Sequence, residues 1–147
     1  MPMKPKTAFA TFDGAAAQAF LYERADKRLR PLPGFPMSGP KKPEFSYPPG
    51  RMFSPSDGRR SSAEPPSDHE KLIERDFVAE VARRLDGLRE KKAFGKLIVA
   101  AGPRALGFWR DVAPTALAAI VDKELASDFA TMDSNALLPH VEKAFLG

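Results

Sequence analysis

The chain has 147 residues, of which 43% are hydrophobic, contains no cysteine and carries a formal net charge of +4. This length suits a single domain over residues 1–147 that buries roughly two-thirds of the surface its unfolded form exposes. The lack of cysteine excludes disulfides, thiolate metal sites and thiol nucleophiles. No stretch reaches the roughly 18 apolar residues of a transmembrane helix, and the first residues lack the apolar core of a signal peptide. We therefore expect a cytoplasmic protein without membrane insertion.

Positive charge is concentrated in the first part of the sequence. Residues 1–60 hold 11 Lys and Arg against 5 Asp and Glu, whereas residues 61–147 hold 12 against 14. A basic segment attracts phosphate backbones or anionic membranes, and it also keeps a proline-rich surface soluble. Charge alone leaves both interpretations open.

The first residues predict an antiparallel meander. Residues 7–13 alternate around aromatic side chains and end at Asp13-Gly14, a dipeptide suited to the positive φ values of a type I′ hairpin turn. The return strand is predicted over residues 16–23, although its alanines are also compatible with a helix. A third strand is predicted over residues 27–32.

A long proline-rich segment follows. Residues 31–66 hold 10 of the 15 prolines and almost no apolar periodicity, so no regular structure is predicted there. Because the segment is far longer than a usual connection, it is either a mobile arm or a functional loop laid across the domain. Four aromatic residues favour a partly ordered loop at about residues 33–66: Phe35, Phe45, Tyr47 and Phe53.

The next stretch is an amphipathic helix that leads into a short apolar run. Ser67 and Glu70 form a capping-box pattern, so the helix is predicted to begin there. Apolar residues recur at steps of three or four and define its buried face: Ile73, Phe77, Val81, Leu85 and Leu88. Residues 96–101 are too few for a buried helix and include β-branched residues, as in a strand covered on both faces. A helix that leads into a buried strand is half of a βαβ unit.

The rest of the chain is predicted to be mostly helical. Gly102-Pro103 predicts a tight turn into a helix that runs through Trp109. A further helix is predicted from Pro114 through Leu125, a short edge strand over residues 126–132 and a last helix from about Ser134. Such an edge would permit pairing with a second copy, and the oligomeric state is left open. The predicted fold class is α/β, a mixed sheet of about five strands with helices packed on it.

The proline-rich segment carries the main candidate binding residues. Arg51, Arg59 and Arg60 are interspersed with glycines and serines, and Phe53 lies among them. Arginine contacts phosphates bidentately and an aromatic ring stacks on an unpaired base, so this pattern predicts RNA contacts. The alternative is a solvated loop, which has the same composition.

Arg104 is a further candidate because it follows the turn at the carboxyl end of a predicted parallel strand. Ligands of open α/β sheets bind beyond this end, where the free N–H groups of a helix start attract anions. We therefore predict a phosphate contact for Arg104. The alternative is a sharp corner that only buries Leu106 and Trp109.

No catalytic constellation is visible in the sequence. Asp68-His69-Glu70 would point in different directions on a helix and fits capping better than a metal site. The chain contains neither G-x-S-x-G nor G-x-x-x-x-G-K. We predict a non-enzymatic protein with no cofactor, with a hydrolase as the less favoured alternative.

Five short motifs resemble those of the bacterial host attachment protein family. They are the Asp13-Gly14 hairpin, PGRMFS at 49–54, GRR and then EP within 58–65, LIVAAGPRALG at 97–107 and ELASDFATM at 124–132. Members of this family resemble the middle domain of archaeo-eukaryotic peptide-chain release factors. The resemblance therefore implies a mixed sheet with helices on its faces and a short strand before the last helix.

Two departures limit what the resemblance implies. The family usually has a histidine after the Gly-Arg-Arg motif, where this chain has Ser61-Ser62. The Gly-Gly-Gln tripeptide of the release factors is absent, and the nearest glycine-bearing loop is formed by residues 56–59. Peptidyl-tRNA hydrolysis is therefore not predicted. The family name records a role in attachment to host cells, but the sequence shows no signal peptide or adhesive repeat that would support direct adhesion. We expect binding to RNA or the ribosome through the basic loop, and the alternative is a protein-interaction factor required for attachment to host cells.

Overall fold

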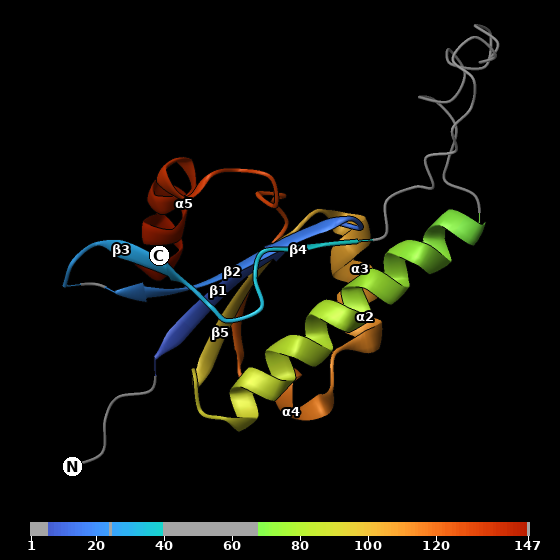
Figure 1. Ribbon diagram of the computed structural model, residues 1–147, viewed down its shortest axis with the longest axis horizontal. Coiled ribbons are helices and arrows are strands. Elements are labelled where there is room, and N and C mark those ends of the chain that lie inside the picture. Colours follow the sequence, from blue (N-terminus) through green and yellow to red (C-terminus); the bar gives the residue numbers. More distant parts are fainter. Residues whose placement is uncertain (1–5, 24, 40–67, 147) are drawn as a thin grey trace, which may run out of the picture.

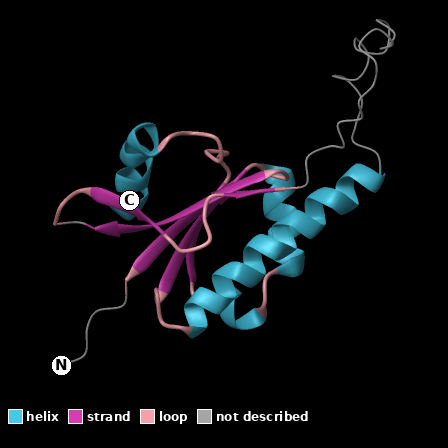
Figure 2. Cartoon of the chain, in the orientation of Figure 1, coloured by secondary structure: helices cyan, strands magenta, loops and turns pink. Residues whose placement is uncertain are grey.

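The computed structural model describes residues 6–23, 25–39 and 68–146. They form a mixed sheet with helices on both faces (Figures 1 and 2). The strands are β1 (Thr7–Phe12), β2 (Ala16–Glu23), β3 (Arg28–Pro31), β4 (Met37–Ser38), β5 (Lys96–Ala101) and β6 (Val121–Leu125). The helices are α2 (Asp68–Glu90), α3 (Pro103–Val112), α4 (Thr115–Ala118) and α5 (Ser134–Leu146). The predicted α/β fold class is confirmed.

The sheet has β1 at its centre and the strand order β3-β2-β1-β5-β6, with β4 paired to β2. The predicted antiparallel meander is formed by β1, β2 and β3. Residues 16–23 are therefore a strand and not a helix. β5 pairs in parallel with β1, and β6 pairs in parallel with β5. Phe9 of β1 lies opposite both Phe20 and Ile98. The carboxyl ends of β1, β5 and β6 therefore share one edge of the sheet.

Successive side chains of a strand point to opposite faces of the sheet, and each face forms its own hydrophobic core. Ala8, Ala10 and Phe12 of β1 face α2, α3 and α4, whereas Phe9 faces α5. Figure 1 shows these helices on opposite sides of the sheet. Because both faces are covered, β1 and β5 are buried almost throughout.

α2 covers the first face with the stripe predicted from its periodicity. Phe77, Val81, Leu85 and Leu88 are buried, and Ile73 is half-buried. The helix begins at Asp68 in the described residues, and the predicted cap at position 67 lies outside them. The stripe is therefore confirmed, whereas the capping box stays a prediction.

The predicted helix from Pro114 through Leu125 is wrong. α4 ends at Ala118, and the next residues form β6 beside β5. The predicted edge strand over residues 126–132 is also wrong, since these residues form no strand. The apolar positions of residues 117–125 fit a helical period as well as a strand, and pairing with β5 decides the outcome.

The proline-rich segment is not wholly irregular, contrary to prediction. β4 pairs with Ala16 and Ala17 at the start of β2, and Phe35 packs against the core. A two-residue strand has no periodicity that a sequence can show. Residues 40–67, which include Phe45 and Tyr47, lie outside the described residues.

The turn after β1 is a hairpin connection, but not of type I′. Among the described residues only Lys27, Gly34 and Lys92 have positive φ. The Asp13 carboxylate instead accepts hydrogen bonds from the backbone N–H groups of Ala15 and Ala16, each at 2.7 Å. A side-chain acceptor thus stabilises the turn without left-handed residues.

Candidate functional site

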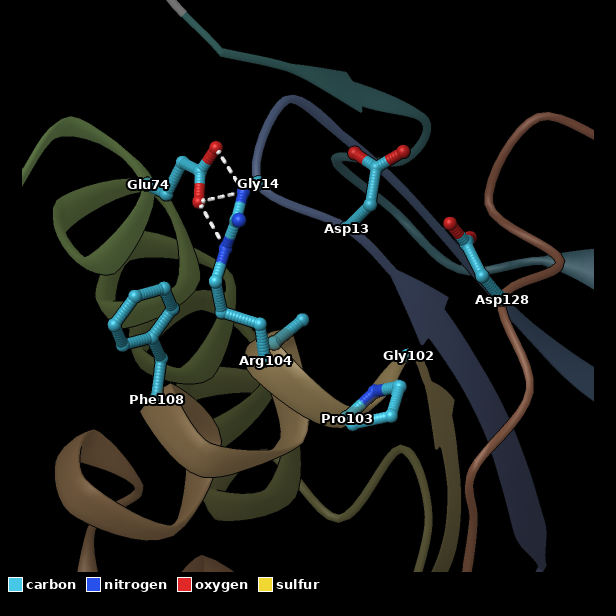
Figure 3. Close-up of a pocket in the computed structure, with 9 residues that line it drawn as sticks. Asp13, Gly14, Glu74, Gly102, Pro103, Arg104, Phe108 and Asp128 are labelled. Carbon is cyan, nitrogen blue, oxygen red and sulfur yellow. Dashed lines mark hydrogen bonds and ion pairs between the residues drawn. The ribbon is translucent and has the colours of Figure 1, made fainter. Parts of the chain in front are cut away.

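A pocket of about 200 Å³ lies at the sheet edge where β1 and β5 end (Figure 3). The turn after β1, the first half of α2, the start of α3 and the segment after β6 supply its walls. The lining residues are Asp13, Gly14, Glu74, Gly102, Pro103, Arg104, Ala105, Phe108 and Asp128. This is the edge at which a site was predicted for Arg104.

The sequence after β5 places Arg104 in the first turn of α3. Gly102 is the N-cap residue and Pro103 is the first helical residue, whose fixed φ is already that of a helix. The Leu106 N–H donates to the Gly102 carbonyl at 2.9 Å. Leu106 and Trp109 are buried, so the predicted sharp corner is present.

Arg104 forms a bidentate salt bridge with Glu74 of α2. Its Nε donates to Glu74 Oε1 at 2.8 Å and its Nη2 donates to Glu74 Oε2 at 2.7 Å. The Glu74 side chain is 23% exposed and that of Arg104 is 51% exposed. The pair joins two helices that are 30 residues apart in the sequence. The phosphate contact of Arg104 stays a prediction, and the contact present here is with Glu74.

Gly14 allows Glu74 to reach this position. A Cβ atom at residue 14 would lie 2.5 Å from Cγ of Glu74, closer than van der Waals contact permits. The glycine in the Asp13-Gly14 dipeptide is therefore explained by close packing against α2 and not by a left-handed φ. Nothing in the local sequence indicates this packing.

Two further carboxylates make the pocket acidic. In Figure 3 Asp13 and Asp128 lie across the pocket from the Arg104–Glu74 pair. Asp128 accepts from the backbone N–H of Ala130 at 3.0 Å, so both aspartates stabilise local turns. Since Glu74 balances Arg104, the two aspartates leave an excess of negative charge that opposes a bound anion. The geometry favours a structural role for this edge.

The other predicted site residues, Arg51, Phe53, Arg59 and Arg60, lie outside the described residues. The described residue before them is Gly39, whose N–H donates to the Ala15 carbonyl at 2.6 Å. The end of β4 and the start of α2 lie on the same side of the molecule (Figure 1). The predicted RNA-binding segment is thus connected to the scaffold beside the β1–β2 turn.

A second hollow of about 370 Å³ lies between β6 and α5. We name it the β6–α5 groove; it is lined by Lys123, Leu125, Ser127, Phe129, His140, Lys143 and Ala144. The sequence does not indicate this groove, because its pattern predicts a helix at residue 123 and a strand at residue 129. The alternation of residues 123, 125 and 127 was the available signal.

Two other kinds of site are not seen in the part of the chain that the structure describes. No three His, Cys, Asp or Glu side chains there are grouped to hold a metal ion. No helix there has the length and apolar character to cross a membrane.

Comparison with known families gives one match, to a family described as "Protein required for attachment to host cells". The match covers residues 8–141, from the start of β1 into α5. No curated protein matches the chain. The likeness to release factors stays a prediction.

Proposed function

The chain belongs to the host attachment family, and on this premise we propose that it is a non-enzymatic domain that binds RNA or the ribosome. Its ligand contacts are Arg51, Arg59 and Arg60, with Phe53 as a stacking residue. The proposal rests on the arginine, glycine and serine pattern of this segment, together with the finding that Arg104, the other predicted phosphate contact, is paired with Glu74.

The scaffold supports this division of roles. The segment with the three arginines begins after Gly39, which is hydrogen-bonded to the β1–β2 turn. The same turn packs against Glu74 through Gly14. The segment is therefore joined to the scaffold beside the β1–β2 turn, close to the Arg104–Glu74 pair.

Arg104 is expected to stabilise the scaffold and to contribute little to RNA binding. The Arg104 guanidinium already forms two hydrogen bonds with the Glu74 carboxylate. A phosphate would have to displace Glu74 in a pocket that also contains the negative charges of Asp13 and Asp128. We therefore expect RNA affinity to depend on the three segment arginines and little on Arg104.

The test is binding of single-stranded and structured RNA oligonucleotides at two salt concentrations. We expect affinity to fall as salt rises, because each phosphate contact releases counterions. The variant R51A/R59A/R60A should lose at least about tenfold in affinity and show a shallower salt dependence.

The control is R30A/R75A/R83A, which removes the same charge from exposed positions of the described scaffold. This variant should bind RNA almost as the wild type does. Equal losses of RNA affinity in the two variants would show that binding depends only on net charge. Wild-type affinity in R51A/R59A/R60A would contradict the proposal.

A protein partner is the second candidate function. It is favoured by the open edge of β6 beside the β6–α5 groove, a surface suited to a peptide.

A further inference from the structure

In the described part of the chain, β6 is the last strand of the sheet on its side. Its one strand partner there is β5, so its outer edge is not paired with any described strand. Among the described residues, no backbone hydrogen bond outside the helices and strands involves residues 121–125. An edge of this kind presents unpaired N–H and C=O groups that another strand can satisfy.

The β6–α5 groove runs along the same edge. A register shift between the pairs Leu97–Val121 and Ile98–Lys123 makes Asp122 an extra residue of β6. Beyond it, Lys123 and Leu125 are aligned with β5 residues that face α5. Side chains of a strand added to β6 would therefore enter the groove at every second position.

The groove combines an apolar floor with cationic walls. Leu125, Phe129 and Ala144 supply the apolar surface. Lys123 Nζ donates to the Ala144 carbonyl at 2.6 Å, which holds this ammonium group at the end of α5. Lys143 is exposed and forms no ion pair with any described carboxylate.

Glu124 of β6 is paired on the opposite face of the strand. Its Oε1 accepts from Nη2 of Arg110 on α3 at 2.6 Å. Asp122 at the register shift is an exposed negative charge of β6, so the positive charge that a partner can meet is that of the lysines in the groove. His140 adds a ring there, stacked on Phe129 with a centroid distance of 4.5 Å.

We propose that the outer edge of β6 and the β6–α5 groove form a docking site for an extended acidic peptide of another protein. The peptide adds to the sheet as a strand and places carboxylates near Lys123 and Lys143 and an apolar side chain over Leu125 and Phe129. Backbone pairing supplies general affinity, and the groove selects an acidic and an apolar residue two positions apart, since these side chains lie on the same face of the added strand.

A second copy of this chain fits the surface less well. A two-fold contact through β6 would bring the same surface of both copies together, including both sets of lysines. Like charges facing each other across paired strands are destabilising. Charge complementarity therefore favours a different, acidic chain.

The experiment uses the whole isotope-labelled protein and a capped synthetic peptide of about ten residues, the valine–glutamate peptide, in which threonine fills every second position and glutamate and valine alternate at the positions between. We expect saturable amide shifts confined to residues 121–127 and 140–144, together with slower hydrogen exchange in β6. A matched peptide with lysine in place of glutamate should cause neither change. If the glutamate peptide leaves these amides unchanged, the proposal is wrong.

A charge-reversed variant locates the contact. Lys143→Glu should weaken binding of the glutamate peptide by about tenfold and improve binding of the lysine peptide. Lys91→Glu makes the same charge change at an exposed site after α2 and should leave both affinities unchanged. Equal losses in both variants would overturn the assigned site.

Two further measurements test whether a nucleic acid or a second copy of the chain binds the groove instead. Single-stranded oligouridylate that shifts the groove amides, when the glutamate peptide does not, would identify a nucleic-acid site and overturn the peptide proposal. Shifts in β6 that depend on protein concentration alone would identify a second copy. The proposal predicts neither result.

Discussion

The pocket at the ends of β1 and β5 and the β6–α5 groove are both charged hollows, yet their charges are arranged differently. In the pocket, Arg104 is held by Glu74 and the two aspartates accept backbone hydrogen bonds. In the groove, Lys143 has no described carboxylate partner. The first set of charges stabilises the scaffold, and the second is available to a ligand.

This difference shows why position in the fold does not by itself identify a site. The carboxyl edge of parallel strands is the usual ligand position in α/β proteins. Here Arg104 is paired with Glu74 and the two aspartates accept backbone hydrogen bonds, whereas Lys143 in the β6–α5 groove has no described carboxylate partner. Whether a charged side chain already has a partner is therefore a better guide to ligand binding than its position at an edge of the sheet.

The largest expected effect concerns the packing beneath the pocket. Trp109 of α3 is 1% exposed and its ring lies 5.4 Å from that of Phe12. Trp109→Ala should lower the free energy of unfolding by about 3–5 kcal/mol, because it leaves a cavity in the core. Urea unfolding measures the change. Leu72→Ala, at a side chain that is 57% exposed, is the control and should change it by less than about 0.5 kcal/mol.

If the two variants were equally stable, α3 would not provide a packed base for the Arg104–Glu74 pair.

An intermediate effect is expected for the segment that separates the two hollows. Gln18 Nε2 donates to the carbonyls of Ala130 at 2.8 Å and Met132 at 2.6 Å. Gln18→Ala should cost about 1–2 kcal/mol of unfolding free energy, because it removes two partly buried hydrogen bonds. It should also weaken peptide binding, since Phe129 lies in the released segment. Asn135→Ala, at an exposed position of α5, serves as the control; equal stability of the two variants would contradict the role of Gln18.

The smallest effect is that of the Arg104–Glu74 pair itself. A double-mutant cycle with Arg104→Ala and Glu74→Ala should give a coupling free energy of about 0.5–1 kcal/mol, since the arginine is half exposed and water screens the pair. The cycle is measured by urea unfolding at low and high salt, and the coupling should decrease at high salt. A coupling of zero at both salt concentrations would show that the pair does not stabilise the scaffold.

Most of the fold was predictable because its signals are local. The buried stripe of α2 follows from apolar spacing, and β5 follows from the length and β-branched residues of its apolar run. The bounds of β2 were predicted from the turn before it, but only its pairing with β1 and β3 excludes a helix there. β6 was not predicted, because its short amphipathic sequence also fits a helix and only pairing with β5 decides. The turn after β1 was predicted from its dipeptide, but its geometry depends on the Asp13 side chain and on α2.

The site was less predictable because distant residues determine it. Arg104 was identified from its place after β5, but its partner Glu74 lies 30 residues earlier and is selected by helix packing. The β6–α5 groove needs β6, the segment after it and α5 to come together. Arg51, Arg59 and Arg60 lie outside the described residues, so their role stays a proposal.

The most direct test measures unfolding free energy and binding of the valine–glutamate peptide for two variants, Arg104→Ala and Lys143→Ala. Arg104→Ala should lower stability by about 1 kcal/mol and leave peptide affinity unchanged, because its charge is used within the scaffold. Lys143→Ala should keep stability within about 0.5 kcal/mol of the wild type and weaken peptide binding. The opposite pattern, with binding lost in Arg104→Ala and stability lost in Lys143→Ala, would contradict the separation of scaffold charges from ligand charges.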